Sequence, residues 1–163
     1  MDILNLTDPD IQTVKNATVE DVRKRIADID LSPIRFRLLY DSTRGASSIP
    51  WRLDCLDEAE TIYRNFLLLA TTSGRRIVTF REIDAVWHAH ILDTRKYRDD
   101  CMAAFGFYLD HFPYLGLRGR EDEAALQRLF TETSMLYQET FGKPYAIPVE
   151  GRPAGHCVPE SCG

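Results

Sequence analysis

The sequence predicts an all-α fold, a single small bundle of about four to five helices with an extended C-terminal tail rich in proline and glycine. Its 163 residues suit one domain, and a hydrophobic content of 44% is enough to fill a core, which excludes disordered and fibrous classes. Apolar residues recur with the 3.6-residue period of helices, and no strand ladder is visible. We divide the chain into a lead-in (1–17), a helical domain (18–143) and an extended tail containing histidine and cysteine (144–163).

Two helices are predicted in the first third of the domain. The first covers about residues 19–30, with Thr18 as N-cap and Asp21 completing a capping box. Its apolar stripe is Val22, Ile26 and Ile29. A short second helix is predicted over residues 35–40, where the alternation of apolar and basic side chains leaves a strand as the less favoured alternative.

Three longer segments follow. A helix over about residues 53–71 ends before Gly74, and one long uninterrupted helix covers about residues 80–105, capped by Thr79 with Glu82 completing its box. Gly106 bends or stops this helix. A last helix covers about residues 121–141, with the inward side chains Leu126, Leu129, Phe130, Met135, Leu136 and Tyr137.

Charge and hydropathy limit the location and the partners. With 25 acidic against 20 basic residues and a net charge of −5, a broad nucleic-acid interface is not expected. No apolar run reaches the roughly 18 residues of a membrane span, and residues 1–5 lack the basic start of a signal peptide. Together with four scattered cysteines, which a reducing compartment would keep free, this predicts a cytoplasmic protein of open oligomeric state with no nucleic-acid or membrane partner.

Most of the candidate functional residues lie close to two histidines of the predicted long helix. His90 falls on the apolar stripe that faces the core, whereas His88 lies about 160° around the helix. On a regular helix the two rings cannot share one ion, as they would in a strand. We therefore expect His88 and His90 to occupy separate environments.

Asp84 and His88 have the i, i+4 spacing that brings two side chains together on one helix face. A carboxylate and an imidazole there can both bind a divalent ion, or Asp84 can orient the ring of His88 from behind. His111 is the first candidate for a further ligand; the others are Glu58, Glu60, His156, Cys157 and Cys162. Such ligands suit iron, copper or zinc, and a tail thiolate would favour zinc or copper.

Ordinary structural roles explain the same residues equally well. A helical Asp–His pair is often a surface salt bridge, and His90 among aromatic neighbours is usually a core histidine with one hydrogen bond. Cys101 suits a small core position, and His111 can cap the end of the long helix. Phosphate-binding glycine loops, nucleophile elbows and the zinc-protease helix motif are absent from the sequence.

One stretch also resembles a known family. Trp87-His88-Ala89-His90, with the later residues Leu92, Tyr97, Asp100, Cys101, Gly106, Asp110 and His111, is similar to the signature of the glycine-rich domain-containing protein-like family. Residues 111–116 resemble its short bacterial members in particular. The resemblance covers about residues 50–142 and implies an α-helical domain without an assigned reaction. Its paired histidines suggest a role beyond packing.

Two functions follow from these observations. The first is a small metalloprotein, an enzyme with a mononuclear site of His88, His111 and one or two of Asp84, His90 or a tail residue. An open coordination position would support redox chemistry or a metal-activated water on a small-molecule or peptide substrate. The second is a non-catalytic interaction module in which the histidines are structural and the tail binds a partner.

Overall fold

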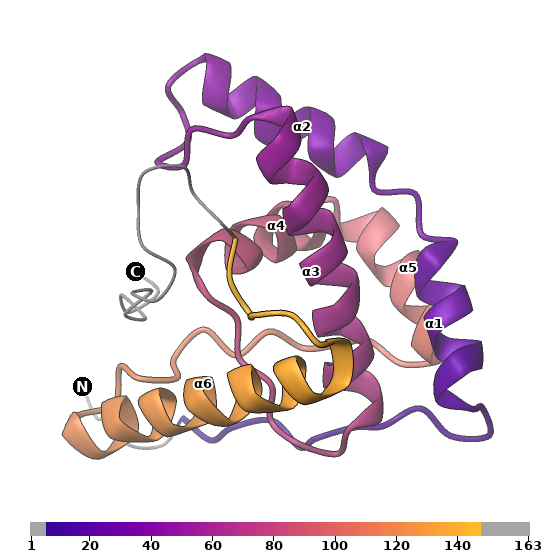
Figure 1. Cartoon of the computed structure of the whole chain (residues 1–163), viewed down its shortest axis with the longest axis vertical. Coiled ribbons are helices and arrows are strands. Elements are labelled where there is room, and N and C mark those ends of the chain that lie inside the picture. The colour runs from indigo at the N-terminus through magenta and orange to yellow at the C-terminus, as the bar shows by residue number, and fades with distance from the viewer. Residues whose placement is uncertain (1–5, 148–163) are drawn as a thin grey trace.

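The computed structural model describes residues 6–147, and in these residues the chain forms six α-helices around one core (Figure 1). They are α1 (Val19–Ala27), α2 (Ser32–Thr43), α3 (Leu53–Thr72), α4 (Arg81–Leu92), α5 (Thr94–Phe105) and α6 (Arg120–Phe141). The described part contains no strand, so the predicted all-α class is confirmed, with one helix more than expected. None of these helices is long and apolar enough to cross a bilayer.

The first two helices begin where local chemistry favours them. Thr18 caps α1, and the predicted box is present because the Asp21 carboxylate accepts from the Thr18 backbone N–H at 2.9 Å. α1 ends at Ala27, earlier than predicted, although Ile29 beyond its end is still buried. α2 confirms the helical interpretation of residues 35–40 and is longer, with Pro33 in its first turn, where proline is well tolerated.

α3 is the central helix of the bundle. It packs against α1 and α4, while α4 in turn contacts α2 and α5 (Figure 1). One side of α3 supplies much of the core, including Leu56, Ala59, Ile62, Tyr63, Phe66 and Leu67. These positions recur at the three- and four-residue spacing of one buried helix face.

The prediction of one long helix over residues 80–105 is wrong, because the helix is interrupted at Asp93 and the chain forms two helices, α4 and α5. Asp93 has φ −80° and ψ 71°, outside the helical region, and its side chain accepts from the Lys96 backbone N–H at 3.4 Å. Asp93 is thus the N-cap of α5, a role that aspartate favours. We call the turn around Asp93 the α4–α5 corner.

The start of α4 also differs from the prediction. Phe80 is the N-cap, and no side chain caps the helix. The hydroxyl of Thr79 instead donates to Asp84 Oδ1 at 3.1 Å. The predicted capping box of Thr79 and Glu82 is therefore wrong, because the helix begins one residue beyond the position that Thr79 could cap.

α6 lies along one edge of the molecule and is joined to it by hydrogen bonds (Figure 1). The Thr133 hydroxyl accepts from the Val78 backbone N–H at 3.2 Å, and the Tyr137 hydroxyl accepts from Asn65 at 2.9 Å. Met135, predicted to face inward, is 58% exposed, because Thr133 and Tyr137 define the buried face of α6.

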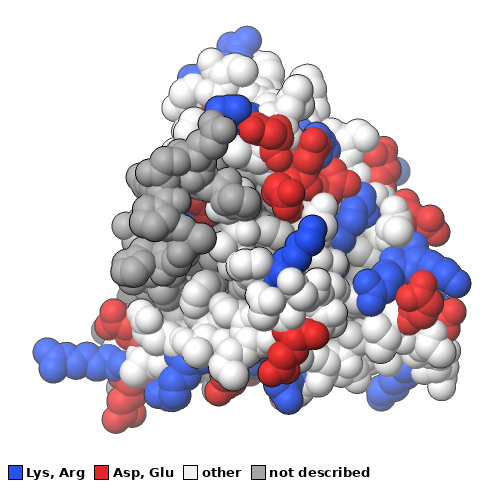
Figure 2. Space-filling model, viewed as in Figure 1, with Lys and Arg blue, Asp and Glu red and all other residues white. Residues whose placement is uncertain are grey.

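Segments before and after the helices pack on the bundle as well. The Val14 backbone N–H donates to the Thr71 carbonyl at 2.8 Å, and Arg76 donates to the Pro9 carbonyl at 2.7 Å. Tyr145, beyond α6, is buried and donates to the Val78 carbonyl at 3.0 Å. On the face shown in Figure 2, acidic and basic side chains of the described residues are interspersed over the surface.

Candidate metal centre

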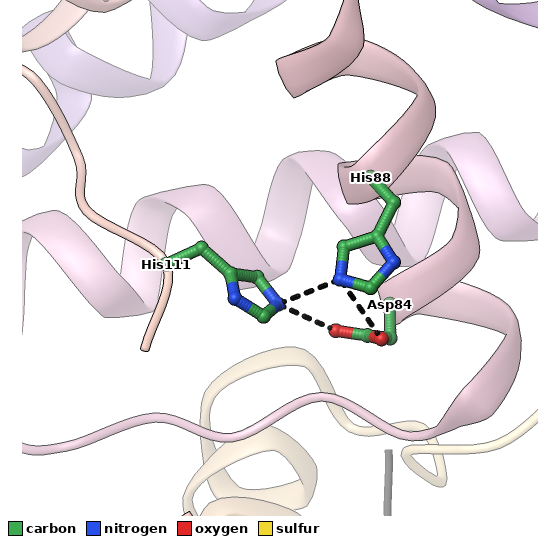
Figure 3. Close-up of side chains that lie close together, drawn as sticks. All are labelled: Asp84, His88 and His111. Atoms are coloured by element: carbon green, nitrogen blue, oxygen red, sulfur yellow. Dashed lines mark hydrogen bonds and ion pairs between the residues drawn. The ribbon is translucent and has the colours of Figure 1, made fainter. Parts of the chain in front are cut away.

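Three side chains from two segments converge beside α4 (Figure 3). His88 Nε2 lies 3.3 Å from Asp84 Oδ2, as their i, i+4 spacing on α4 predicts. His111, from the segment after α5, places its Nε2 3.0 Å from His88 Nε2 and 2.9 Å from Asp84 Oδ1. The geometry allows Asp84, His88 and His111 to hold a metal ion.

The group lies at the boundary between core and solvent. The Asp84 side chain is 9% exposed and that of His111 14%, whereas His88 is 49% exposed. The ring of His111 also contacts the ring of Trp87, with 4.5 Å between centroids. Two members of the group are therefore held by packing, and the third borders water, from which an ion or a small molecule can approach.

Asp84 is oriented from two sides of its carboxylate. Its Oδ1 accepts from the Thr79 hydroxyl and faces His111, while Oδ2 faces His88. Asp84 is also close enough to Tyr145 for its charge to raise the pKa of that phenol, although burial is the main cause of the shift. A carboxylate with both oxygens directed to imidazoles is arranged either to bind an ion with them or to orient them.

His90 lies apart from this group, in the core, as its position on the apolar stripe predicts. Its Nδ1 is 2.8 Å from the Tyr63 hydroxyl and its Nε2 is 2.8 Å from Asp100 Oδ2. Burial lowers the pKa of His90 below its usual value, and the hydrogen bond with Asp100 acts in the opposite direction. Because the Asp100 carboxylate only accepts, His90 Nε2–H is the donor and Nδ1 accepts from Tyr63.

The partners of His90 were not predicted from the sequence. A straight helix would place His90 and Asp100 about 15 Å apart along its axis. The α4–α5 corner folds α5 back and brings them into contact, and Lys96 adds an ion pair to Asp100 at 2.9 Å. The signal that could have revealed this was Asp93 followed by Thr94, a good start for a new helix.

Two of the remaining candidate ligands, Glu58 and Glu60, are not part of the group. Glu60 on α3 is paired with Arg35 at 2.9 Å and Arg64 at 2.7 Å, and Glu58 is an exposed residue of the same helix. His156, Cys157 and Cys162 lie outside the described residues. Cys101 is buried in the core, as predicted.

The fold and this group define the chain as a small helical protein with a two-histidine, one-carboxylate cluster beside its core. The chain belongs to the UCP032817-like family, whose family model matches residues 51–139, and this confirms the resemblance to glycine-rich domain-containing proteins. The matched segment includes α3, α4, α5 and most of α6.

A plant relative supports this membership. The chain is 32% identical over 95 residues to Glycine-rich domain-containing protein 1 of Arabidopsis thaliana. The matched part is 55% of this chain but 11% of that relative, so the chain corresponds to a small portion of the plant protein. No solved structure gives a significant match to the chain.

Proposed function

We propose that this chain is a metalloprotein that binds one divalent transition-metal ion through Asp84, His88 and His111. The observation that carries the proposal is the convergence of two imidazole nitrogens and the carboxylate, with His111 Nε2 at 3.0 Å from His88 Nε2 and 2.9 Å from Asp84 Oδ1. Two histidines and one carboxylate with open positions are typical of non-haem iron enzymes.

Hydrogen bonds alone do not explain all three contacts of the group at once. His111 Nε2 carries at most one proton, yet it faces both His88 Nε2 and Asp84 Oδ1. If that proton is donated to Asp84, the two imidazole nitrogens face each other without a well-directed bond. A positive ion between the three atoms would interact favourably with all of them, which supports metal binding over a purely structural role.

The spacing of the ligand atoms suits a divalent transition-metal ion. With metal–ligand bonds of about 2.1 Å, neighbouring ligands of an octahedron lie about 3.0 Å apart and those of a tetrahedron about 3.4 Å apart. The separations here, 2.9, 3.0 and 3.3 Å, fall in the range of these two values. Imidazole and carboxylate ligands suit iron, copper and zinc.

An ion held by these three residues would keep coordination positions open for water, substrate or an oxidant. Because His88 is half exposed, these positions are reachable from solvent. We therefore propose an enzyme that acts on a small-molecule or peptide substrate by redox chemistry or through a metal-activated water.

The proposal is tested on protein purified without a histidine tag. We expect anaerobic titration with Fe(II), and with Co(II) as a spectroscopic probe, to give one ion per chain by calorimetry and elemental analysis. His88→Ala should lose this ion, whereas Asp99→Ala, which removes an exposed carboxylate of α5, should keep it. Folded wild-type protein that binds no ion would exclude the proposal and support the interaction module with structural histidines.

A further inference from the structure

His111 lies in a segment that belongs to no helix, so other contacts must fix its position. The chain leaves α5 at Gly106, whose φ of 79° lies in the left-handed region that favours glycine. The carbonyl of Leu109, two residues before His111, then accepts from the Tyr97 hydroxyl at 2.6 Å. This bond ties the segment that carries His111 to α5.

The Tyr97 hydroxyl is itself held in place. It accepts from Trp87 Nε1–H at 2.9 Å, and the Tyr97 side chain is completely buried. Trp87 lies next to His88 on α4, and its ring packs against the ring of His111. A continuous set of contacts thus runs from α4 through Trp87 and Tyr97 to Leu109.

Cys101 supports the same segment from one turn further along α5. It is buried, and its thiol lies beside the backbone of Leu109. Burial raises the pKa of this thiol while the backbone of Leu109 opposes the shift, so the group remains a neutral thiol. α5 therefore contacts the backbone of Leu109 with two side chains at i and i+4 spacing.

We propose that Tyr97 is a positioning residue for the candidate metal centre, because its hydroxyl, held by Trp87 and bonded to the Leu109 carbonyl, sets the distance of His111 from His88 and Asp84. This inference rests on the proposed function of that group. It also gives a physical role to three residues of the family signature: Tyr97 and Cys101 contact Leu109, and the intervening Asp100 bonds to His90.

The test compares two buried hydroxyl groups. Tyr97→Phe removes the bond to Leu109 and keeps the ring, and its matched control, Tyr63→Phe, removes a buried hydroxyl that bonds to His90. Loss of such an outer hydrogen bond typically weakens metal binding by about 10- to 100-fold. We expect Tyr97→Phe to lose Co(II) affinity by that factor and to change the visible spectrum of the Co(II) complex. Tyr63→Phe should leave both the affinity and the spectrum unchanged.

Equal affinities for wild type and Tyr97→Phe, or equal losses in both variants, would overturn the inference. Cys101→Ala provides a second variant on the same segment, with the same expected direction, should Tyr97→Phe fail to fold.

A readout without metal separates this inference from the proposed function. Because the Trp87 ring lies 4.5 Å from the ring of His111, the Cε1 proton of His111 reports their relative position in the NMR spectrum. We expect Tyr97→Phe to shift this resonance and Tyr63→Phe to leave it in place. If wild type binds no Co(II), the metal proposal fails, and the NMR comparison alone decides whether Tyr97 positions His111.

Discussion

His90 and Asp100 are ten residues apart in the chain, and their side chains meet at 2.8 Å between Nε2 and Oδ2. This contact exists because the chain breaks at Asp93 and α5 folds back on α4. The same break brings Tyr97 to Trp87. The α4–α5 corner therefore organises both the buried histidine and the contacts that lead to His111.

The buried histidine should contribute strongly to stability. His90→Ala removes a fully packed ring, the hydrogen-bond partner of the Tyr63 hydroxyl and one of the two partners of Asp100, so we expect the free energy of unfolding to fall by roughly 2 to 4 kcal/mol. Denaturant unfolding followed by circular dichroism measures the change. Asp99→Ala, an exposed neighbour on α5, should stay within about 0.5 kcal/mol of wild type. An equally small loss for His90→Ala would contradict its place in the hydrogen-bonded core.

The cap at Asp93 offers a test of the corner itself. Asp93→Ala removes the acceptor for the Lys96 backbone N–H, and we expect a loss of about 1 kcal/mol in unfolding experiments. Asp93→Ser keeps a capping oxygen and should recover most of that loss. If serine proves no better than alanine, the side chain of Asp93 does not cap α5.

Much of this architecture could be predicted from the sequence. The period of apolar residues identified residues 80–105 as helical, although as one helix and not two, and the i, i+4 rule placed Asp84 beside His88. The break at Asp93 was not predicted, because apolar residues keep their helical spacing on both sides of it. That spacing alone cannot reveal that Asp93 caps a new helix. The contacts of Asp100 and Tyr63 with His90 depend on that break and could not be predicted without it.

Metal binding should stabilise the folded chain. An ion that binds only the folded state adds about 2.7 kcal/mol to the free energy of unfolding at a free concentration of 100 times Kd. We expect Co(II) to raise the Tm of wild type and to leave that of His111→Ala unchanged, as measured by differential scanning calorimetry. A similar increase for both proteins would show that the ion binds elsewhere.

Tyr145 links the segment after α6 to the core. Its ring packs against Phe80 and Tyr137, and its hydroxyl donates to the Val78 carbonyl. Tyr145→Ala should lower the free energy of unfolding by about 3 to 5 kcal/mol, the range for large buried aromatic side chains. The exposed Tyr114 gives the control, since Tyr114→Ala is expected to change stability by less than about 0.5 kcal/mol.

Alkaline pH should destabilise the fold through its buried phenols. Burial raises the pKa values of Tyr63, Tyr97 and Tyr145 above their usual value, so these groups ionise more readily in the unfolded chain. Their contribution is therefore fully present below about pH 10 and is lost as the pH rises above it. We expect unfolding midpoints in urea to fall between pH 9 and 11, with a smaller decrease in Tyr63→Phe than in wild type.

The α4–α5 corner also has a kinetic consequence. Because His90 and Asp100 are separated by only ten residues, their contact closes a short loop, and loops of this length close within about 10 to 100 ns. Contacts so local cost little chain entropy, whereas Tyr145 meets Val78 across 67 residues. We therefore expect α4 and α5 to associate early during folding, before α6 docks on the bundle.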